Sequence, residues 1–140
     1  MKSHILRTWV EIDRKALRHN VGEFFRIVPP ETRLMAVIKS NAYGHGLVTV
    51  APELVRTQPF GDKGWFGVDS IVEALRLRRV GILNPILVLG FTLPLRMIEA
   101  ARERISISIS NFDALTLYQS CRIAPQFILS LIPACIGRDF

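Results

Sequence analysis

The sequence predicts an α/β protein built on a parallel sheet, because short apolar runs alternate with segments of helical periodicity along most of the chain. Each apolar run is followed by a helical segment, and this rhythm is typical of parallel strands joined by right-handed crossovers. The expected strands lie near residues 34–38, 64–68, 86–89 and 105–109.

Length and composition limit the class of protein. The chain has 140 residues, of which 49% are hydrophobic and 21% charged, so it can build a core and is not intrinsically disordered. The longest apolar run, residues 127–136, is about half the length of a membrane-spanning helix. Residues 1–7 lack the apolar core of a secretory signal. We therefore expect a cytoplasmic protein with no membrane partner.

The basic charge raises the question of nucleic-acid binding. The net charge is +6 and the pI is about 10.0, yet the arginines are scattered. The densest cluster, residues 76–79, ends an expected helix, where cations complement the helix dipole. We expect a solvated helix end and no nucleic-acid partner, with a basic nucleic-acid-binding module as the alternative from another functional class.

The cysteines do not predict a metal site. Cys121 and Cys135 form no C-x-x-C pair and have no metal-ligand spacing with the three histidines. We expect reduced thiols and no bound metal.

The first elements follow from patterning and capping. Residues 8–12 alternate apolar and polar faces, as a strand does. Asp13 is a candidate N-cap for the helix that follows, and Pro29-Pro30 ends that helix. The apolar side of the helix comprises Leu17, Val21, Phe24, Phe25 and Val28. Residues 34–38 then form a compact apolar strand.

The helix after the second strand has a defined start and end. Ser70 and Glu73 have the spacing of a capping box, and Gly81 is a stop signal after a helix that runs to Val80. Asp69 and Glu73 both follow a strand end. Because Ser70 and Glu73 already form a capping box, we assign both acidic residues to helix capping.

The remaining helices are expected over residues 48–56, over residues 95–103 and from near Phe112, with Asn111 as candidate N-cap for the last. Isoleucine and serine alternate over residues 105–109, which is the period-2 pattern of a strand.

The segment with the clearest chemical signal is AVIKSNAYGHG, residues 36–46. Lys39 occupies the last position of a buried parallel strand, and functional sites of α/β folds are built at that edge. A lysine removed from water there suits Schiff-base chemistry, Gly44 and Gly46 let backbone approach a ligand, and Tyr43 offers a hydroxyl. The residues alone indicate a lysine that handles a carbonyl or a phosphate. The commoner alternative is a strand-end lysine that extends into solvent.

Two sheet architectures fit the β/α rhythm, a doubly wound open sheet and a (β/α)8 barrel. No G-x-G-x-x-G follows the first strand of the series, which disfavours a dinucleotide-binding sheet. A closed barrel needs about 250 residues, so this chain holds barely half of one.

The motif AVIKSNAYGHG resembles the pyridoxal-phosphate attachment motif of bacterial alanine racemases. The resemblance continues through TWVEIDRKALRHNV, PPETRLMAVIK, GWFGVDSIVEALRLRRVGI and NPILVLGFT, and covers residues 7–117. It implies a partial (β/α)8 barrel of the TIM type, roughly its first half. It also implies pyridoxal 5'-phosphate as cofactor, interconversion of L-alanine and D-alanine for peptidoglycan, and a homodimer as the family's assembly.

Residue roles carry over from the resemblance position by position. Lys39 matches the lysine that holds the cofactor and serves as one of two catalytic bases, working on the face of the D-enantiomer. Tyr43 matches a tyrosine that contacts the cofactor phosphate. Val37 and Leu89 match apolar residues beside the cofactor ring, although both would be core residues in any barrel. For His45 we expect a hydrogen bond that orders the loop. The family's second base, a tyrosine of the partner subunit, and an arginine facing the pyridine nitrogen lie far downstream.

Two related readings stay open. A non-catalytic pyridoxal-phosphate-binding barrel also carries a lysine at a strand end, but the run SNAYGHG favours a racemase. Racemases for other amino acids share much of this motif, and substrate specificity would lie outside the matched part.

The family pattern stops near Tyr118, so we divide the chain into a partial barrel domain, 1–120, and a non-homologous tail, 121–140. The tail's prolines and apolar runs predict no helix or strand. Back-translated with permitted codons and read in a shifted frame, residues 127–140 allow HFKFDTGMHRTGF, the family's signature for the next strand. We therefore hypothesise a frame change between Leu117 and Cys121, and expect the 140-residue chain to be weakly active or inactive alone.

Overall fold

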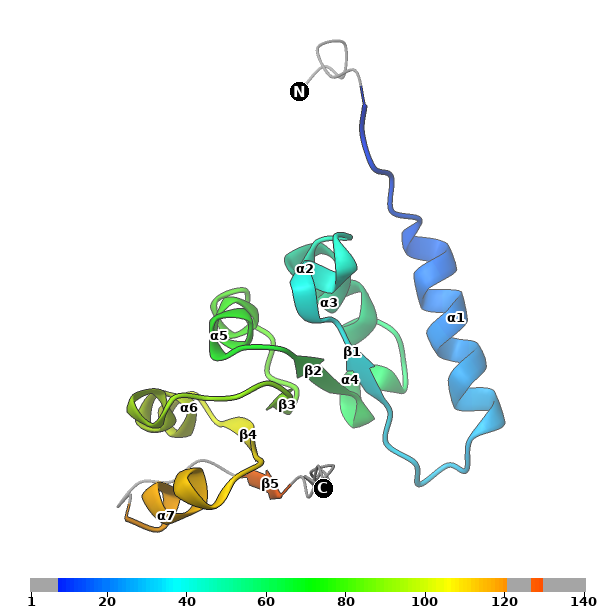
Figure 1. The fold of residues 1–140 in the computed structure, drawn as a ribbon. Helices are drawn as coiled ribbons and strands as arrows, with labels where there is room; N and C mark the ends of the chain where they lie inside the picture. Colours follow the sequence, from blue (N-terminus) through cyan, green and yellow to red (C-terminus); the bar gives the residue numbers. More distant parts are fainter. Residues whose placement is uncertain (1–7, 121–126, 130–140) are drawn as a thin grey trace, which may run out of the picture.

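A computed structural model describes residues 8–120 and 127–129 as one five-stranded sheet with helices packed against it (Figure 1). The strands are β1 (Met35–Val37), β2 (Trp65–Val68), β3 (Ile86–Val88), β4 (Ile105–Ile109) and β5 (Phe127–Leu129). All neighbours pair in parallel, and their order in the sheet follows the chain. The first four strands confirm the expected ones. Stepwise order of parallel strands is the topology of a (β/α) barrel wall.

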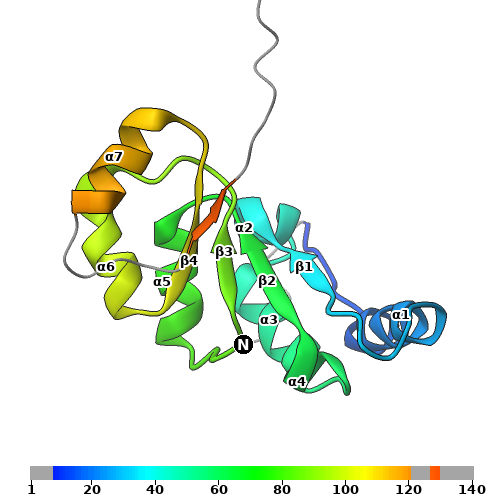
Figure 2. The ribbon, with the colours of Figure 1, turned by 90° about the horizontal axis from the view of Figure 1, so that it is seen from below.

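The helices follow the strands in alternation. They are α1 (Arg14–Ile27), α2 (Lys39–Tyr43), α3 (Leu47–Val55), α4 (Phe60–Lys63), α5 (Ile71–Arg79), the 3-10 turn η2 (Pro94–Arg96), α6 (Met97–Arg102) and α7 (Phe112–Ser120). The sheet is curved, and α5, α6 and α7 lie along its convex side (Figures 1 and 2). The other side of the sheet carries no helix in the described part of the chain.

The alternation of side chains along the strands produces two different faces. On the helix side, Phe66, Ile86 and Ile105 are aligned across the sheet and are fully buried. The next layer, on the concave side, aligns Val37 with Gly67, and Val37 is 40% exposed. The core therefore lies between sheet and helices, where each large side chain contributes about 1.5–3 kcal/mol by burial.

The segment before α1 differs from the expectation. Residues 8–13 have no regular structure, and Trp9 and Val10 are 63% and 77% exposed. The prediction of a strand over residues 8–12 is wrong for the described structure. A strand needs a neighbouring strand for its backbone hydrogen bonds, and the described part provides none there. Asp13 is the N-cap as expected, because its carboxylate accepts from the backbone of Lys15 and Ala16 at 2.8 and 3.0 Å.

An ion cluster attaches α1 to α3. Glu53 of α3 is only 3% exposed, and its carboxylate accepts from Arg14, Arg18 and Arg56. A buried carboxylate is stable when cations and hydrogen bonds compensate its lost hydration, and three guanidinium groups do so here. On the apolar side of α1, Leu17, Val21 and Phe25 pack against the core, whereas Phe24 is 58% exposed.

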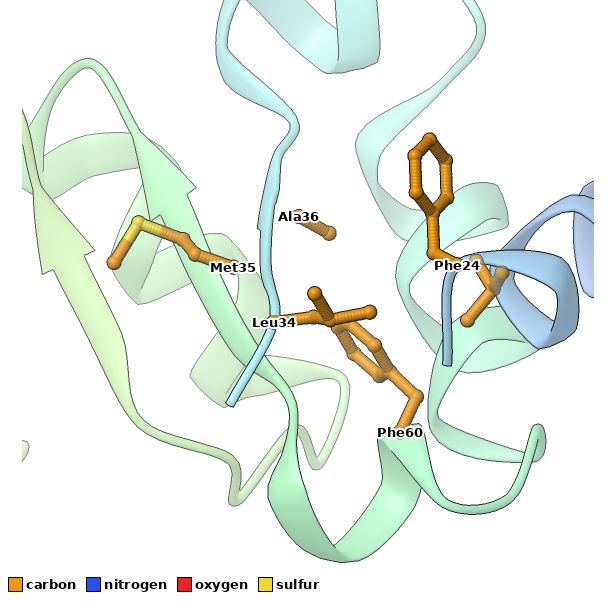
Figure 3. A pocket seen from close by; sticks show the side chains of 6 residues that line it. Phe24, Leu34, Met35, Ala36 and Phe60 are labelled. Carbon is orange, nitrogen blue, oxygen red and sulfur yellow. The ribbon is translucent and has the colours of Figure 1, made fainter. Parts of the chain in front are cut away.

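A pocket of about 260 Å³ separates the end of α1 from β1. Figure 3 shows Leu34 and Ala36 on the α1 side of β1, together with Phe24 and Phe60, while Met35 lies on the opposite side of the strand. In the described part of the chain β1 pairs with β2 alone. The outer edge of β1 therefore faces this apolar gap.

One member of the basic cluster at the end of α5 is structural. Arg76 and Arg79 are exposed, as expected for a solvated helix end, but Arg78 is half-buried. Its guanidinium donates to the backbone oxygens of Ile82, Asn84, Glu103 and Arg104 at 2.6 to 2.9 Å. Burial lowers the pKa of Arg78 from its ordinary value, while Glu103 opposes the shift. The expectation of a solvated cluster is therefore wrong for Arg78.

The segment after residue 120 also departs from the expectation. β5 pairs with β4 in parallel register, with Ile107 opposite Phe127 and Ile109 opposite Leu129. The prediction that this segment contains no strand is wrong at residues 127–129. No helix in the described ranges is long and apolar enough to cross a membrane.

Candidate active site at the carboxyl edge of β1

Lys39 lies at the carboxyl edge of the sheet. β1 ends at Val37, and the Ile38 amide still donates to the Gly67 carbonyl of β2 at 2.8 Å. Lys39 is therefore the first residue after the last sheet hydrogen bond of its strand, and it is half-buried. This is the edge at which parallel α/β folds place reactive groups. The prediction that Lys39 ends a buried strand is wrong, because β1 is partly exposed and Lys39 begins α2.

The backbone after Lys39 forms a left-handed turn. Ser40, Asn41, Ala42 and Tyr43 have φ between 52° and 55°, a region that residues other than glycine rarely occupy. The sequence predicted a turn-rich loop here but not its handedness. Gly44 ends the turn at φ 88°, where glycine pays no steric penalty. Strained backbone of this kind costs about 1–3 kcal/mol per residue, and it persists only where surrounding contacts hold it.

Local hydrogen bonds hold part of this turn. The Asn41 side chain accepts from the Leu47 amide at 3.0 Å, which ties the turn to the first residue of α3. Nδ1 of His45 lies 2.8 Å from the Ala42 carbonyl, so His45 makes the expected loop-ordering hydrogen bond. The Ala42 amide donates to the Ile38 carbonyl at 2.9 Å.

Glu73 supplies a contact that the sequence did not reveal. Ser70 caps α5 by accepting from the Glu73 amide at 3.4 Å, which is one half of the predicted capping box. The other half is absent, because the Glu73 carboxylate accepts from the Asn41 amide at 2.9 Å and from the Asp69 amide at 3.0 Å. The prediction that Glu73 completes the box is therefore wrong. Its carboxylate instead connects α5 to the turn that follows Lys39.

A small apolar surface on the concave side of the sheet lies beside this turn. Val37 ends β1 and Leu89 follows β3, and they are 40% and 39% exposed. Between them, a Cβ placed on Gly67 would lie 3.3 Å from each of the two side chains. The glycine thus lets the side chains of Met35, Val37 and Leu89 pack closely over the β2 backbone.

The adjacent loops approach closely at the same edge. The Gly90 amide donates to the Asp69 carbonyl at 3.1 Å, and a Cβ on Gly90 would lie 2.3 Å from that oxygen. Glycine is therefore required where the ends of β2 and β3 meet. Beyond it, the Thr92 hydroxyl is buried without a hydrogen-bond partner in the described structure.

Of the four predicted site residues, the structure brings Val37 and Leu89 together across Gly67 and sets Lys39 two residues beyond Val37. Tyr43 ends the left-handed turn and is 60% exposed, with its ring at the surface. Chemically, the edge offers a primary amine, a phenol and an apolar surface. No group of three or more His, Cys, Asp or Glu side chains able to hold a metal occurs in the described ranges.

A curved parallel sheet with helices on its convex side and a lysine at its carboxyl edge defines a segment of a (β/α)-barrel enzyme. The family model for the alanine racemase N-terminal domain matches residues 12–128. The chain belongs to the alanine racemase family, whose members are racemases, and its fold is a partial barrel of that family.

Individual relatives agree with this assignment. An alanine racemase of Nostoc is 45% identical over 97 residues, which cover 69% of this chain and 24% of the relative. A serine/alanine racemase of Enterococcus gallinarum is 41% identical over 116 residues, 82% of this chain and 16% of the relative. The alanine racemase structure from Clostridium difficile superposes with a TM-score of 0.73 at 28% identity, over 81% of this chain and 28% of that chain. The chain thus spans about a quarter or less of the curated relatives' length.

Proposed function

We propose that this chain provides the cofactor-anchoring part of an alanine racemase, with Lys39 as the residue that holds pyridoxal 5'-phosphate. The observation that carries the proposal is the position of Lys39 at the carboxyl edge of β1, within a chain that belongs to the racemase family. Alanine is the proposed substrate, and the proposed product is its mirror image.

The residues at this edge fit such a group. A planar, partly apolar ring needs an accessible apolar surface, and the partly exposed side chains of Val37 and Leu89 provide one on either side of Gly67. Lys39 stands beside that surface, and its amine is the nucleophile that an aldehyde requires. The exposed Tyr43 hydroxyl is available to donate to a phosphate oxygen.

When bound, the cofactor would be held through its aldehyde by the Lys39 amine, and its conjugated ring would acidify the Cα proton of an amino acid. Lys39 anchors the group and then accepts or returns that proton on one face of Cα. Val37 and Leu89 exclude water from one side of the ring, and Tyr43 orients the phosphate. Inverting the centre takes a second base on the opposite face, which the resemblance places downstream of the matched residues. We therefore propose that the 140-residue chain binds the cofactor and racemises alanine weakly or not at all.

Other properties of the family are part of the same proposal. We infer that the complete protein works as a cytoplasmic homodimer that supplies D-alanine for peptidoglycan. A racemase for another amino acid is the second candidate, because the Enterococcus gallinarum relative is named for serine as well as alanine.

The test is covalent labelling of Lys39. The purified chain is incubated with pyridoxal 5'-phosphate, reduced with borohydride and digested, and the adduct is located by mass spectrometry. We expect the adduct predominantly at Lys39, with little at Lys2, Lys15 and Lys63, which serve as internal controls. A Lys39→Ala variant should lose it. Equal labelling of all four lysines would contradict the proposal.

A further inference from the structure

We propose that Glu73 is a positioning residue for Lys39, because its carboxylate holds the left-handed turn that sets where the lysine amine lies. This inference rests on the proposed function, and it adds a residue to the same site. Glu73 lies on α5, in the second β/α unit, whereas Lys39 follows the first strand.

The contacts of Glu73 join two strand ends. One carboxylate oxygen accepts from the Asn41 amide at 2.9 Å and the other from the Asp69 amide at 3.0 Å. Asn41 lies two residues after Lys39, and Asp69 directly follows β2. Glu73 also lies in the first turn of α5, where the helix dipole stabilises a negative charge. The ionised carboxylate therefore clamps both strand ends with charge-assisted hydrogen bonds.

The turn depends on this clamp because its own hydrogen bonds leave the Asn41 amide unused. Inside the turn, the donors are the amides of Ala42, Gly44, His45 and Gly46. Among the described contacts, Glu73 is the acceptor for Asn41. The torsion angles at this point are unfavourable, so the loss of an acceptor shifts the backbone toward ordinary conformations. The backbone that carries Lys39 then shifts, and its side chain shifts with it.

Glu73 acts through the backbone rather than on the amine. Its described hydrogen bonds run to the two amides and none runs to Lys39. Replacing Glu73 should therefore slow the labelling of Lys39 while leaving the labelling of Lys2, Lys15 and Lys63 unchanged.

The key variant is Glu73→Gln, which keeps the length of the side chain but removes one of the two acceptors. Ser70→Ala is the matched control, because it removes the N-cap of the same helix and leaves the carboxylate in place. Glu99→Gln is a second control, since Glu99 occupies the first turn of α6 and pairs with the Arg96 side chain. Glu73→Asp serves if the first variant fails to fold, because it keeps the charge and shortens the reach.

Two measurements on the full chain decide the question. Hydrogen exchange of the peptide covering residues 38–46 reports the turn without any cofactor, and we expect exchange at Asn41 to become about tenfold faster in E73Q. Labelling of Lys39 with pyridoxal 5'-phosphate and borohydride should slow by a similar factor. Both controls should behave like the parent.

Unchanged exchange in E73Q and E73D would overturn the inference, and so would equal acceleration by Ser70→Ala or an equal loss of labelling at Lys2, Lys15 and Lys63. If the parent chain is not labelled at Lys39, the proposed function fails, whereas the exchange measurement still decides the role of Glu73.

Discussion

Replacing Arg78 with alanine should destabilise the fold by about 2–4 kcal/mol. Its guanidinium donates to the carbonyls of Ile82 and Asn84 in partly buried surroundings, and to Glu103 and Arg104 at the surface. The two surface carbonyls can turn to water, so they contribute little. The carbonyls of Ile82 and Asn84 lose charge-assisted hydrogen bonds worth about 1.5–3 kcal/mol each, and partial access of water to these carbonyls reduces the summed loss.

The assay is urea denaturation of the purified chain, monitored by circular dichroism. The loss in the free energy of unfolding is calculated from the shift in the urea midpoint at constant slope. Arg79→Ala is the matched control, because Arg79 is the exposed neighbour on the same helix, and it should change stability by less than about 0.5 kcal/mol. Arg78→Lys should fall between the parent and Arg78→Ala, since one ammonium group cannot reach all the carbonyls. Equal midpoints for Arg78→Ala and Arg79→Ala would refute this reasoning.

Three further outcomes are expected. Glu53→Gln should destabilise the chain by about 1–3 kcal/mol and speed hydrogen exchange in α1, because the acceptor of Arg14 and Arg18 loses its charge. Gly90→Ala should lower the urea midpoint, since its Cβ would lie 2.3 Å from the Asp69 oxygen, whereas Gly22→Ala meets no atom within 4 Å and should raise it. Sequencing the DNA for residues 117–140 should show codons that read D-T-G-M in the shifted frame, and codons that forbid this reading exclude the frame change.

Local periodicity was sufficient to predict the four strands from Met35 to Ile109. The apolar runs of β2, β3 and β4 are largely buried, and burial gives the pattern that sequence analysis detects, whereas β1 is partly exposed. The same pattern misled at residues 8–12, where alternation is present but no neighbouring strand is described. Whether a segment pairs with another strand depends on distant parts of the chain, so the residue pattern within the segment cannot predict it. β5 shows the opposite error, because Phe127–Leu129 begins an apolar run whose pattern did not predict a strand, and it gains its hydrogen bonds from β4.

The candidate site also combines features that the local sequence predicts with contacts between residues far apart in the chain. The position of Lys39 at the carboxyl edge of the sheet could be predicted from its strand and motif. The left-handed turn that follows could not, because no residue type in SNAY by itself predicts a positive φ. Glu73 could be assigned only to the cap, because its second partner, Asn41, lies 32 residues away. The signal in the sequence was the position of Glu73, three residues after Ser70. Which amides donate to the carboxylate depends on how β1 and β2 are paired.

The contacts that hold Lys39 come from a short stretch of chain. The turn after Lys39 rests on β2 through Gly67, on α5 through Glu73 and on α3 through Leu47, all within the first two β/α units. The backbone around Lys39 is therefore held by neighbours present in the described structure and not by closure of a barrel. If Lys39 acts as the base on one face of a substrate, as we propose, proton transfer on the opposite face requires a second group. Anchoring and inversion are thus separable, and this chain should show the first without the second.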